Sequence, residues 1–199
     1  MTQLALFTGA RREELCALRW ADVDFERATI RFERSMQRIP GAGVVFAPPK
    51  TKRSRRIIRV GDNCIELLRE YRQIQREQRL RMGSAWVRTV DICGKTIKND
   101  LIFTRADGAP FDPHSITSWF SKFLKANNLT SAHFHSLRHS NATLLIADHV
   151  PVSAVSGRLG HANISTTLNI YTSVIQSADA AAANSLESTF ERIKEKNHA

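Results

Sequence analysis

Residues 133–140 read HFHSLRHS, and the apolar pattern that they begin continues to residue 147. Leu137, Leu144 and Leu145 are spaced as one face of a helix, so we expect a helix over residues 136–147. His135 and Arg138 are three residues apart at its start and would share a face. An imidazole and a guanidinium together can move a proton and hold a negative charge, so this helix is the first candidate for a functional site.

Toward the C-terminus, two further segments carry polar residues at helix ends. Residues 157–161 read GRLGH, and Gly160 predicts the end of a helix over residues 152–159. Asn163 predicts the start of another helix that reaches about Tyr171, within NIYTS at residues 169–173. A last helix is expected over residues 177–194, because apolar side chains recur there at three- and four-residue spacing.

Toward the N-terminus, residues 8–15 read TGARREEL and residues 48–56 read PPKTKRSRR. The second segment is a basic turn between two expected strands, residues 44–47 and 56–60. With residues 29–33, these strands predict a small antiparallel three-stranded sheet. Helices are expected over residues 62–81 and 113–125, each preceded by or starting at an aspartate cap, whereas residues 83–99 could form a loop insertion.

The overall pattern is α+β and mostly helical, and its charge points to a polyanionic partner. The chain has 199 residues, with 29 Lys and Arg against 19 Asp and Glu, which gives a net charge of +10. A domain of this size and charge suits nucleic acid, and no apolar run approaches the roughly 20 residues of a membrane helix. The three cysteines are widely spaced and form no CxxC pair, which favours reduced thiols in a cytoplasmic protein.

Taken together and in order, the segments at residues 8–15, 48–56, 133–140, 157–161 and 169–173 resemble the tyrosine recombinases of the phage integrase class. The resemblance implies their catalytic-domain fold over residues 1–199, with a C-terminal tail helix at 175–199. Members of the family usually carry a core-binding domain upstream of the catalytic one. We therefore expect the chain to be a fragment of a longer protein, without that domain.

The resemblance also implies an activity: site-specific recombination through a 3′-phosphotyrosyl intermediate, with no metal or other cofactor. Arg11 and Arg138 would hold the non-bridging oxygens of the transition state, with a hydrogen bond from His161. His135 would act as general acid and base. The six implied catalytic positions are Arg11, Lys50, His135, Arg138, His161 and Tyr171.

Tyr171 would be the nucleophile, and it is one of only two tyrosines in the chain. Lys50 would protonate the departing 5′ oxygen, although Lys52 lies two residues away and remains an alternative. The residues expected to contact DNA form one basic run: Lys50, Lys52, Arg53, Arg55 and Arg56. Ser136 and Ser173 stand where many family members have other residues, but neither position is one of the six.

The implied partners are double-stranded DNA and other protomers of the same protein, assembled on DNA as a tetrameric synapse. Accessory DNA-bending or directionality proteins are further candidates. The resemblance suggests a protein of a phage or mobile element, located in the cytoplasm and associated with the nucleoid, with no membrane partner.

Three other interpretations remain. A non-catalytic DNA-binding module would explain the charge, and a type IB topoisomerase would use similar chemistry. His133, His135 and His139 could also form a metal cluster, but no HExxH motif, cysteine or suitably placed carboxylate completes it.

Overall fold

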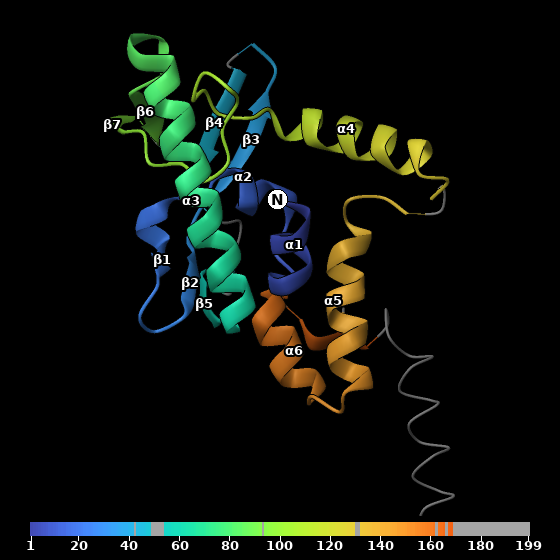
Figure 1. The fold of residues 1–199 in the computed structure, drawn as a ribbon. Helices are drawn as coiled ribbons and strands as arrows, with labels where there is room; N and C mark the ends of the chain where they lie inside the picture. The colour runs from blue at the N-terminus through green and yellow to red at the C-terminus, as the bar shows by residue number, and fades with distance from the viewer. Residues whose placement is uncertain are drawn as a thin grey trace, which may run out of the picture.

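The computed structural model describes residues 1–41, 43–48, 54–92, 94–129, 132–161, 163–165 and 167–168. Two short helices, α1 (Thr2–Thr8) and α2 (Arg12–Cys16), lie in the middle of the molecule, and α3 (Asp62–Met82) lies on one side of them (Figure 1). On the other side lie α5 (Ser136–Ala147) and, beside it, α6 (Val152–Leu159). Helix α4 (Pro113–Ala126) extends outward from this body.

The described strands form three small antiparallel sheets. One has the order β1 (Val23–Asp24), β2 (Thr29–Phe32) and β5 (Arg56–Arg59), with Ile30 opposite Ile58. The other two are the hairpins β3 (Ser35–Ile39) with β4 (Gly43–Ala47), and β6 (Thr89–Ile92) with β7 (Lys95–Lys98). Short 3-10 helices, η1 (Trp20–Asp22) and η3 (Gly83–Ala85), connect these parts.

A three-stranded antiparallel sheet is present, but the prediction of its members was wrong for one strand. Strand β4 pairs with β3 in a separate hairpin, and the third place in the sheet belongs to β1. Strand β1 has only two residues, too few to show an alternation of apolar and polar side chains. Strand β3 (SMQRI) is too polar for such an alternation to be recognised. The undecided residues 83–99 contain the β6–β7 hairpin.

The predicted helices agree with the structure wherever residues are described. Asp112 accepts a hydrogen bond from the His114 amide at 2.9 Å and caps α4, with Pro113 in the first turn. Gly160 ends α6 in the left-handed conformation. Asn163 accepts a hydrogen bond from the Ser165 amide at 3.1 Å, where a further helical stretch begins. Tyr171 and the tail helix expected at 175–199 lie outside the described residues.

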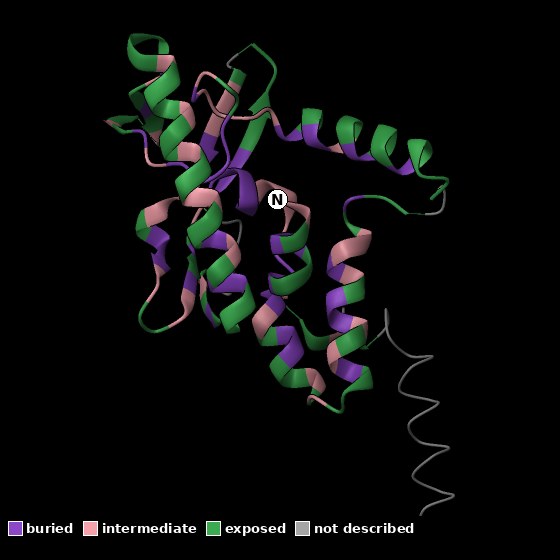
Figure 2. Cartoon of the chain, in the orientation of Figure 1, coloured by how far each residue is buried: buried purple, intermediate pink, exposed green. Residues whose placement is uncertain are grey.

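Most of the buried apolar side chains form one core between α1, α2, the strands, the first half of α3 and the inner side of α4. A smaller cluster, Ala142, Ile146, Val155 and Leu159, joins α5 to α6. Figure 2 shows that the outer sides of α3 and α4 are exposed. None of the helices in the part of the chain that the structure describes is both long and apolar enough to cross a membrane.

Gly9 is the point at which the N-terminal helix meets α5 and α6. It ends α1 with φ 62° and ψ 15°, a conformation that favours glycine. A Cβ atom at this position would lie 2.4 Å from Leu159 Cδ2 and 2.7 Å from Asn141 Oδ1. Asn141 in turn donates from Nδ2 to the Leu6 carbonyl at 2.7 Å. The end of α1 can therefore approach α5 and α6 only because residue 9 has no side chain.

We predict that Gly9→Ala lowers the free energy of unfolding by about 2–4 kcal/mol, because a left-handed backbone strain adds to overpacking against Leu159. Gly41→Ala is the matched control, since Gly41 also has a positive φ (77°) but no atom within 4 Å of the added Cβ. Urea denaturation of both variants measures the difference. Equal losses in the two variants would show that Gly9 is needed only for its backbone conformation.

Candidate active site

Arg11 stands at the junction between α1 and α2, where it is the N-cap residue of α2. Its amide donates to Glu14 Oε2 at 2.8 Å, and its guanidinium Nη1 lies 3.2 Å from Glu14 Oε1. The Arg11 side chain is 35% exposed, whereas that of Glu14 is 6% exposed. One buried carboxylate thus orients both the backbone and the partly exposed guanidinium of Arg11.

Arg56 on β5 completes the coordination of Glu14. Its Nη1 and Nη2 donate to the two carboxylate oxygens, each at 2.9 Å, and its Nε donates to the Arg158 carbonyl at 2.7 Å. The guanidinium also lies 4.6 Å from the centroid of the Phe32 ring. Burial alone would raise the pKa of Glu14, but the hydrogen bonds and charges of Arg56 and Arg11 hold it below its ordinary value. This network ties β5 to α2 and to the end of α6.

Arg138 on α5 is buried between the C-terminal ends of two other helices. Its Nη1 donates to the Gly9 carbonyl at 2.7 Å and its Nη2 to the Leu159 carbonyl at 2.9 Å, and the residue is 3% exposed. The carbonyls at the end of a helix have no partner within the helix and carry partial negative charge. The two carbonyls therefore supply the hydrogen-bond acceptors that a buried guanidinium needs, and they fix the guanidinium plane between α1 and α6.

His135 is the residue immediately before α5, one turn from Arg138, and it is exposed. Its ring contacts that of His139 edge to face, with 4.8 Å between centroids. Desolvation, followed by the charges of His139, Arg138, His133 and Arg11, lowers the pKa of His135. The His135 imidazole is therefore neutral at pH 7 and able to accept a proton.

His161 follows the glycine that ends α6. Its Nδ1 lies 2.7 Å from the hydroxyl of Thr167, which is fully buried. Burial lowers the pKa of His161 to about 4, and the charges of Arg138, Arg11, His135 and Arg56 act in the same direction. Residues of α5 and β5, with Arg11 just before α2 and His135 just before α5, thus lower the pKa of one imidazole at the end of α6. Arg138 donates to the Gly9 carbonyl, two residues before Arg11, and to the Leu159 carbonyl, two residues before His161. Four of the six predicted catalytic residues therefore lie in one cluster: Arg11, His135, Arg138 and His161.

A pocket of about 210 Å³ opens beside this cluster. His135 and Arg138 line it together with His133, and Arg12 and Thr117 close its other side. Arg12 donates to the Glu13 carboxylate and to the Thr117 hydroxyl. The bond to Thr117 joins α2 to α4. Two members of the cluster, His135 and Arg138, therefore line a pocket at the surface.

The remaining predicted site residues divide into two groups. Lys50, Lys52, Arg53 and Tyr171 lie outside the described residues. Arg55 is exposed, as a DNA contact requires, but the Arg56 side chain is only 6% exposed and pairs with Glu14. This placement argues against the expected DNA contact by Arg56. Its side chain instead holds the carboxylate of Glu14 inside the protein.

The sequence analysis missed Glu14, Arg158 and Thr167. Glu14 stands three residues after Arg11, the spacing at which a carboxylate caps a helix start, so its backbone contact could have been anticipated. Arg158 donates to the Phe7 carbonyl at 3.0 Å and to the Arg59 carbonyl at 2.8 Å, partners far away in sequence. Among the described residues, no group of three or more His, Cys, Asp or Glu side chains is placed to hold a metal ion.

Comparison with known proteins gives consistent matches. The model of the phage integrase family matches residues 1–177. A "Tyrosine recombinase XerC-like" protein of Caldanaerobacter subterraneus is 33% identical over 195 residues, which cover 94% of this chain and 48% of that protein. The "ICEBs1 integrase" of Bacillus subtilis is 29% identical, over 84% of this chain and 42% of the relative. The chain spans about half the length of the curated relatives it matches.

Solved structures show the same fold. A Tn1549 transposon integrase in complex with a circular intermediate DNA superposes with a TM-score of 0.71 at 24% identity, over 85% of this chain and 52% of that one. The XerA recombinase superposes with a TM-score of 0.64 at 23% identity, over 90% of this chain and 54% of that one. The described part of the chain therefore has the fold of a tyrosine recombinase catalytic domain.

The Glu14 network generates a prediction about stability and pH. A carboxyl whose folded-state pKa is depressed contributes stability above its ordinary pKa, here 4.5, and loses it as the pH falls through the folded value. At pH 7, Glu14→Gln should lower the free energy of unfolding by about 3 kcal/mol, because Arg56 keeps a buried charge without its partner.

The difference between wild type and Glu14→Gln should narrow as the pH is lowered below 4.5, because the wild-type carboxyl then becomes neutral as well. Denaturant unfolding between pH 7 and pH 3.5 measures this. Glu13→Gln is the control: Glu13 pairs with Arg12 in a more exposed position and should cost less than about 1 kcal/mol. A loss that is independent of pH would show that the charge of Glu14 does not matter.

Proposed function

The chain belongs to the phage integrase family, and from this premise we propose that it carries the DNA cleavage and rejoining chemistry of a site-specific tyrosine recombinase. The curated relatives described above are named as recombinases and integrases. The observation that supports the proposal most strongly is that Arg138 donates to the carbonyls of Gly9 and Leu159, which stand two residues before Arg11 and two residues before His161. Such a cluster is a poor arrangement for stability and a good one for holding an anion.

The two arginines suit the transition state of phosphodiester exchange. Negative charge develops on the two non-bridging oxygens, and guanidinium groups match such oxygens with paired donors that do not lose their charge. Arg138 is fixed by the Gly9 and Leu159 carbonyls, and Arg11 is fixed by Glu14. Donors oriented before the reaction need no reorganisation while the charge forms, which is the main source of such electrostatic stabilisation.

The two histidines take different roles. With a pKa of about 4, His161 is neutral at pH 7, and we assign the Thr167 hydroxyl as donor to its Nδ1. This tautomer leaves Nε2–H to donate to a non-bridging oxygen. His135 is neutral, exposed and adjacent to Arg138, so it can accept the proton of an attacking hydroxyl.

The proposed step is a transesterification. The Tyr171 oxygen attacks phosphorus and forms a 3′-phosphotyrosyl bond, its proton passes to His135, and the 5′ oxygen leaves with a proton from Lys50. Lys52 remains the alternative donor of that proton. Rejoining is the reverse reaction with another 5′ hydroxyl, and no external energy source is needed, because one phosphodiester bond replaces another.

Double-stranded DNA is the proposed substrate and partner. The net charge of +10 supports it, as does the exposed Arg55 within the basic run. Assembly of several protomers on DNA, accessory DNA-bending or directionality proteins and a nucleoid location remain part of the proposal. They rest on the family alone. The tail at 175–199 is the segment proposed to act between protomers.

A covalent adduct tests the proposal directly. A pool of nicked duplexes of random sequence provides a substrate although the DNA site is unknown, because a nick next to the cleaved bond lets a short strand leave and traps the adduct. We predict that wild type forms protein–DNA adducts that survive denaturation, and that Tyr171→Phe forms none.

Tyr71→Phe is the matched control, since Tyr71, on α3, is the other tyrosine and its ring packs against that of Phe103. It should form adducts as wild type does. Adducts in Tyr171→Phe would exclude Tyr171 as nucleophile. If wild type binds DNA but gives no adduct with any sequence, the chain is a non-catalytic DNA-binding module.

Because Arg11 and Arg138 make different contacts, we predict that replacing them has different effects on stability. Arg11→Gln should slow adduct formation roughly 100-fold, the usual scale for losing one charge-stabilising donor, with little change in the unfolding midpoint. Arg138→Gln should slow it as much and also lower the free energy of unfolding by roughly 2–3 kcal/mol, since two helix-end carbonyls lose a charged donor. The rate of adduct formation and the thermal unfolding midpoint are measured for both variants. Wild-type stability in Arg138→Gln would contradict its bridging role.

A further inference from the structure

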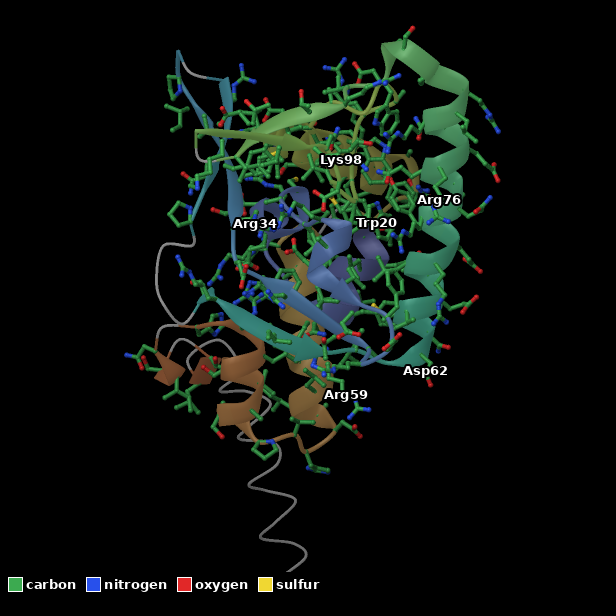
Figure 3. The ribbon with its side chains drawn as sticks, turned by 90° about the vertical axis from the view of Figure 1, so that its left-hand side faces the viewer. Trp20, Arg34, Arg59, Asp62, Arg76 and Lys98 are labelled. Carbon is green, nitrogen blue, oxygen red and sulfur yellow. The ribbon has the colours of Figure 1, made fainter. Side chains whose placement is uncertain are left out.

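A second pocket, of about 300 Å³, lies on the side of the molecule formed by α3. It is lined by two tryptophans and four basic residues, Trp20, Trp86, Arg72, Arg76, Arg79 and Lys98. Figure 3 shows Trp20, Arg76 and Lys98 near one another on this face. Its lining comes from η1, α3, the residue after η3 and the chain around the end of β7.

This pocket is separate from the candidate active site. None of its lining residues belongs to the arginine and histidine cluster, and none lines the pocket beside His135. Helices α1 and α2 lie between α3 and α5 (Figure 1). The proposed cleavage chemistry therefore gives no reason for the charges gathered here.

Three of the four cations form a row on α3. Arg72, Arg76 and Arg79 are spaced by four and three residues, so they share a face, and Lys98 reaches the same pocket from the end of β7. Elsewhere on this helix Arg69 pairs with Glu66 and Arg81 with Glu77. Within the described part of the chain, no carboxylate lies within ion-pair distance of the four cations of the pocket.

One carboxylate lines the pocket and does not cancel this charge. Asp100 Oδ1 lies 3.8 Å from Arg19 Nε, so the ion pair that it forms is with a cation outside the row. The four cations and Asp100 leave an excess of positive charge around a concave surface. Such a surface attracts and orients an anion.

The walls of the pocket are held in place by hydrogen bonds that are buried or partly buried. Trp20 Nε1 donates to Gln75 Oε1 at 2.7 Å, and Gln75 Nε2 donates to the Ile102 carbonyl at 2.7 Å. Asn99 donates to the Val87 and Gly108 carbonyls, each at 2.8 Å. The guanidinium of Arg72 lies 5.4 Å from the centroid of the Trp20 ring. The pocket is thus formed before any ligand arrives, which reduces the cost of binding.

We propose that this pocket is a binding site for a phosphate ester, separate from the phosphodiester that is cleaved. A phosphate group offers several acceptor oxygens to cations on different sides, and arginine matches it with paired donors. The ring of an attached base can stack on a guanidinium plane. The phosphate belongs either to the backbone of a second DNA segment or to a free nucleotide, and the two sources share this chemistry.

Tryptophan fluorescence tests the proposal. The chain has three tryptophans, and Trp119 on α4 is the one outside the pocket. In the full chain carrying Trp119→Phe, the signal comes from Trp20 and Trp86 alone. Inorganic phosphate, a mononucleotide and a short duplex are titrated separately at constant ionic strength, with chloride as the reference. A saturable change with phosphate or a phosphate ester is expected, and saturation by the mononucleotide or by the duplex alone identifies the source.

Matched double variants locate the site. Arg76→Gln with Arg79→Gln should weaken the binding roughly tenfold or more, because charge-assisted hydrogen bonds are lost. Arg69→Gln with Arg81→Gln removes the same charge from the same helix outside the pocket, and it should leave the affinity within about twofold.

Equal weakening in both double variants would mean attraction by net charge and would overturn the proposal. So would the absence of a saturable change with every phosphate compound, or saturation by a hexaglutamate peptide but not by phosphate. Because the measurement requires no DNA cleavage, its outcome is independent of whether Tyr171 forms an adduct.

Discussion

The arrangement of the candidate active site depends on one buried guanidinium held between the carbonyl ends of two helices. Arg138 bridges the Gly9 carbonyl after α1 and the Leu159 carbonyl at the end of α6. Each of these helices ends in a glycine with a left-handed backbone, and each presents carbonyl groups that lack a helical partner. The partial negative charge of the two helix ends offsets the cost of burying the cation. Through this contact, segments 129 and 21 residues away from Arg138 in sequence meet at one point.

A second buried charge, that of Glu14, is also offset by groups of opposite charge and holds other cations near the cluster. It holds Arg11 at the start of α2 and Arg56 on β5, so that the single negative charge orders two positive ones. The result is an excess of cations around His161, which stays neutral because burial and like charges oppose its protonation. Repulsion among these groups costs stability in the absence of a ligand. An anionic phosphodiester would relieve that repulsion, which is why we propose that the same residues serve binding and chemistry.

The helices and most of the cluster could be predicted from sequence, whereas the sheet and the internal ion pairs could not. Asp112 and Gly160 mark helix ends by local chemistry, and the structure confirms both. Strand β1 is too short to show a pattern of apolar residues, so the sequence predicts β4 as the third strand of the sheet, where the structure has β1. Arg55 and Arg56 look equivalent in a basic run, yet Arg55, just before β5, is exposed, whereas the side chain of Arg56, the first residue of β5, is buried against Glu14. The partner of Arg56 is 42 residues away, and no local signal reveals it.

The pKa of His161 is the most direct measurement of the central claim, that burial and the charges anchored by Arg138 and Glu14 converge at one point. Nuclear magnetic resonance of the imidazole, followed from pH 8 to pH 5, distinguishes the outcomes without unfolding the protein by acid. The account predicts that His161 remains neutral over this whole range, in keeping with a pKa of about 4. Titration of His161 at or above its ordinary value of 6.5 would contradict the account, because the buried, positively charged environment would then not exist in solution.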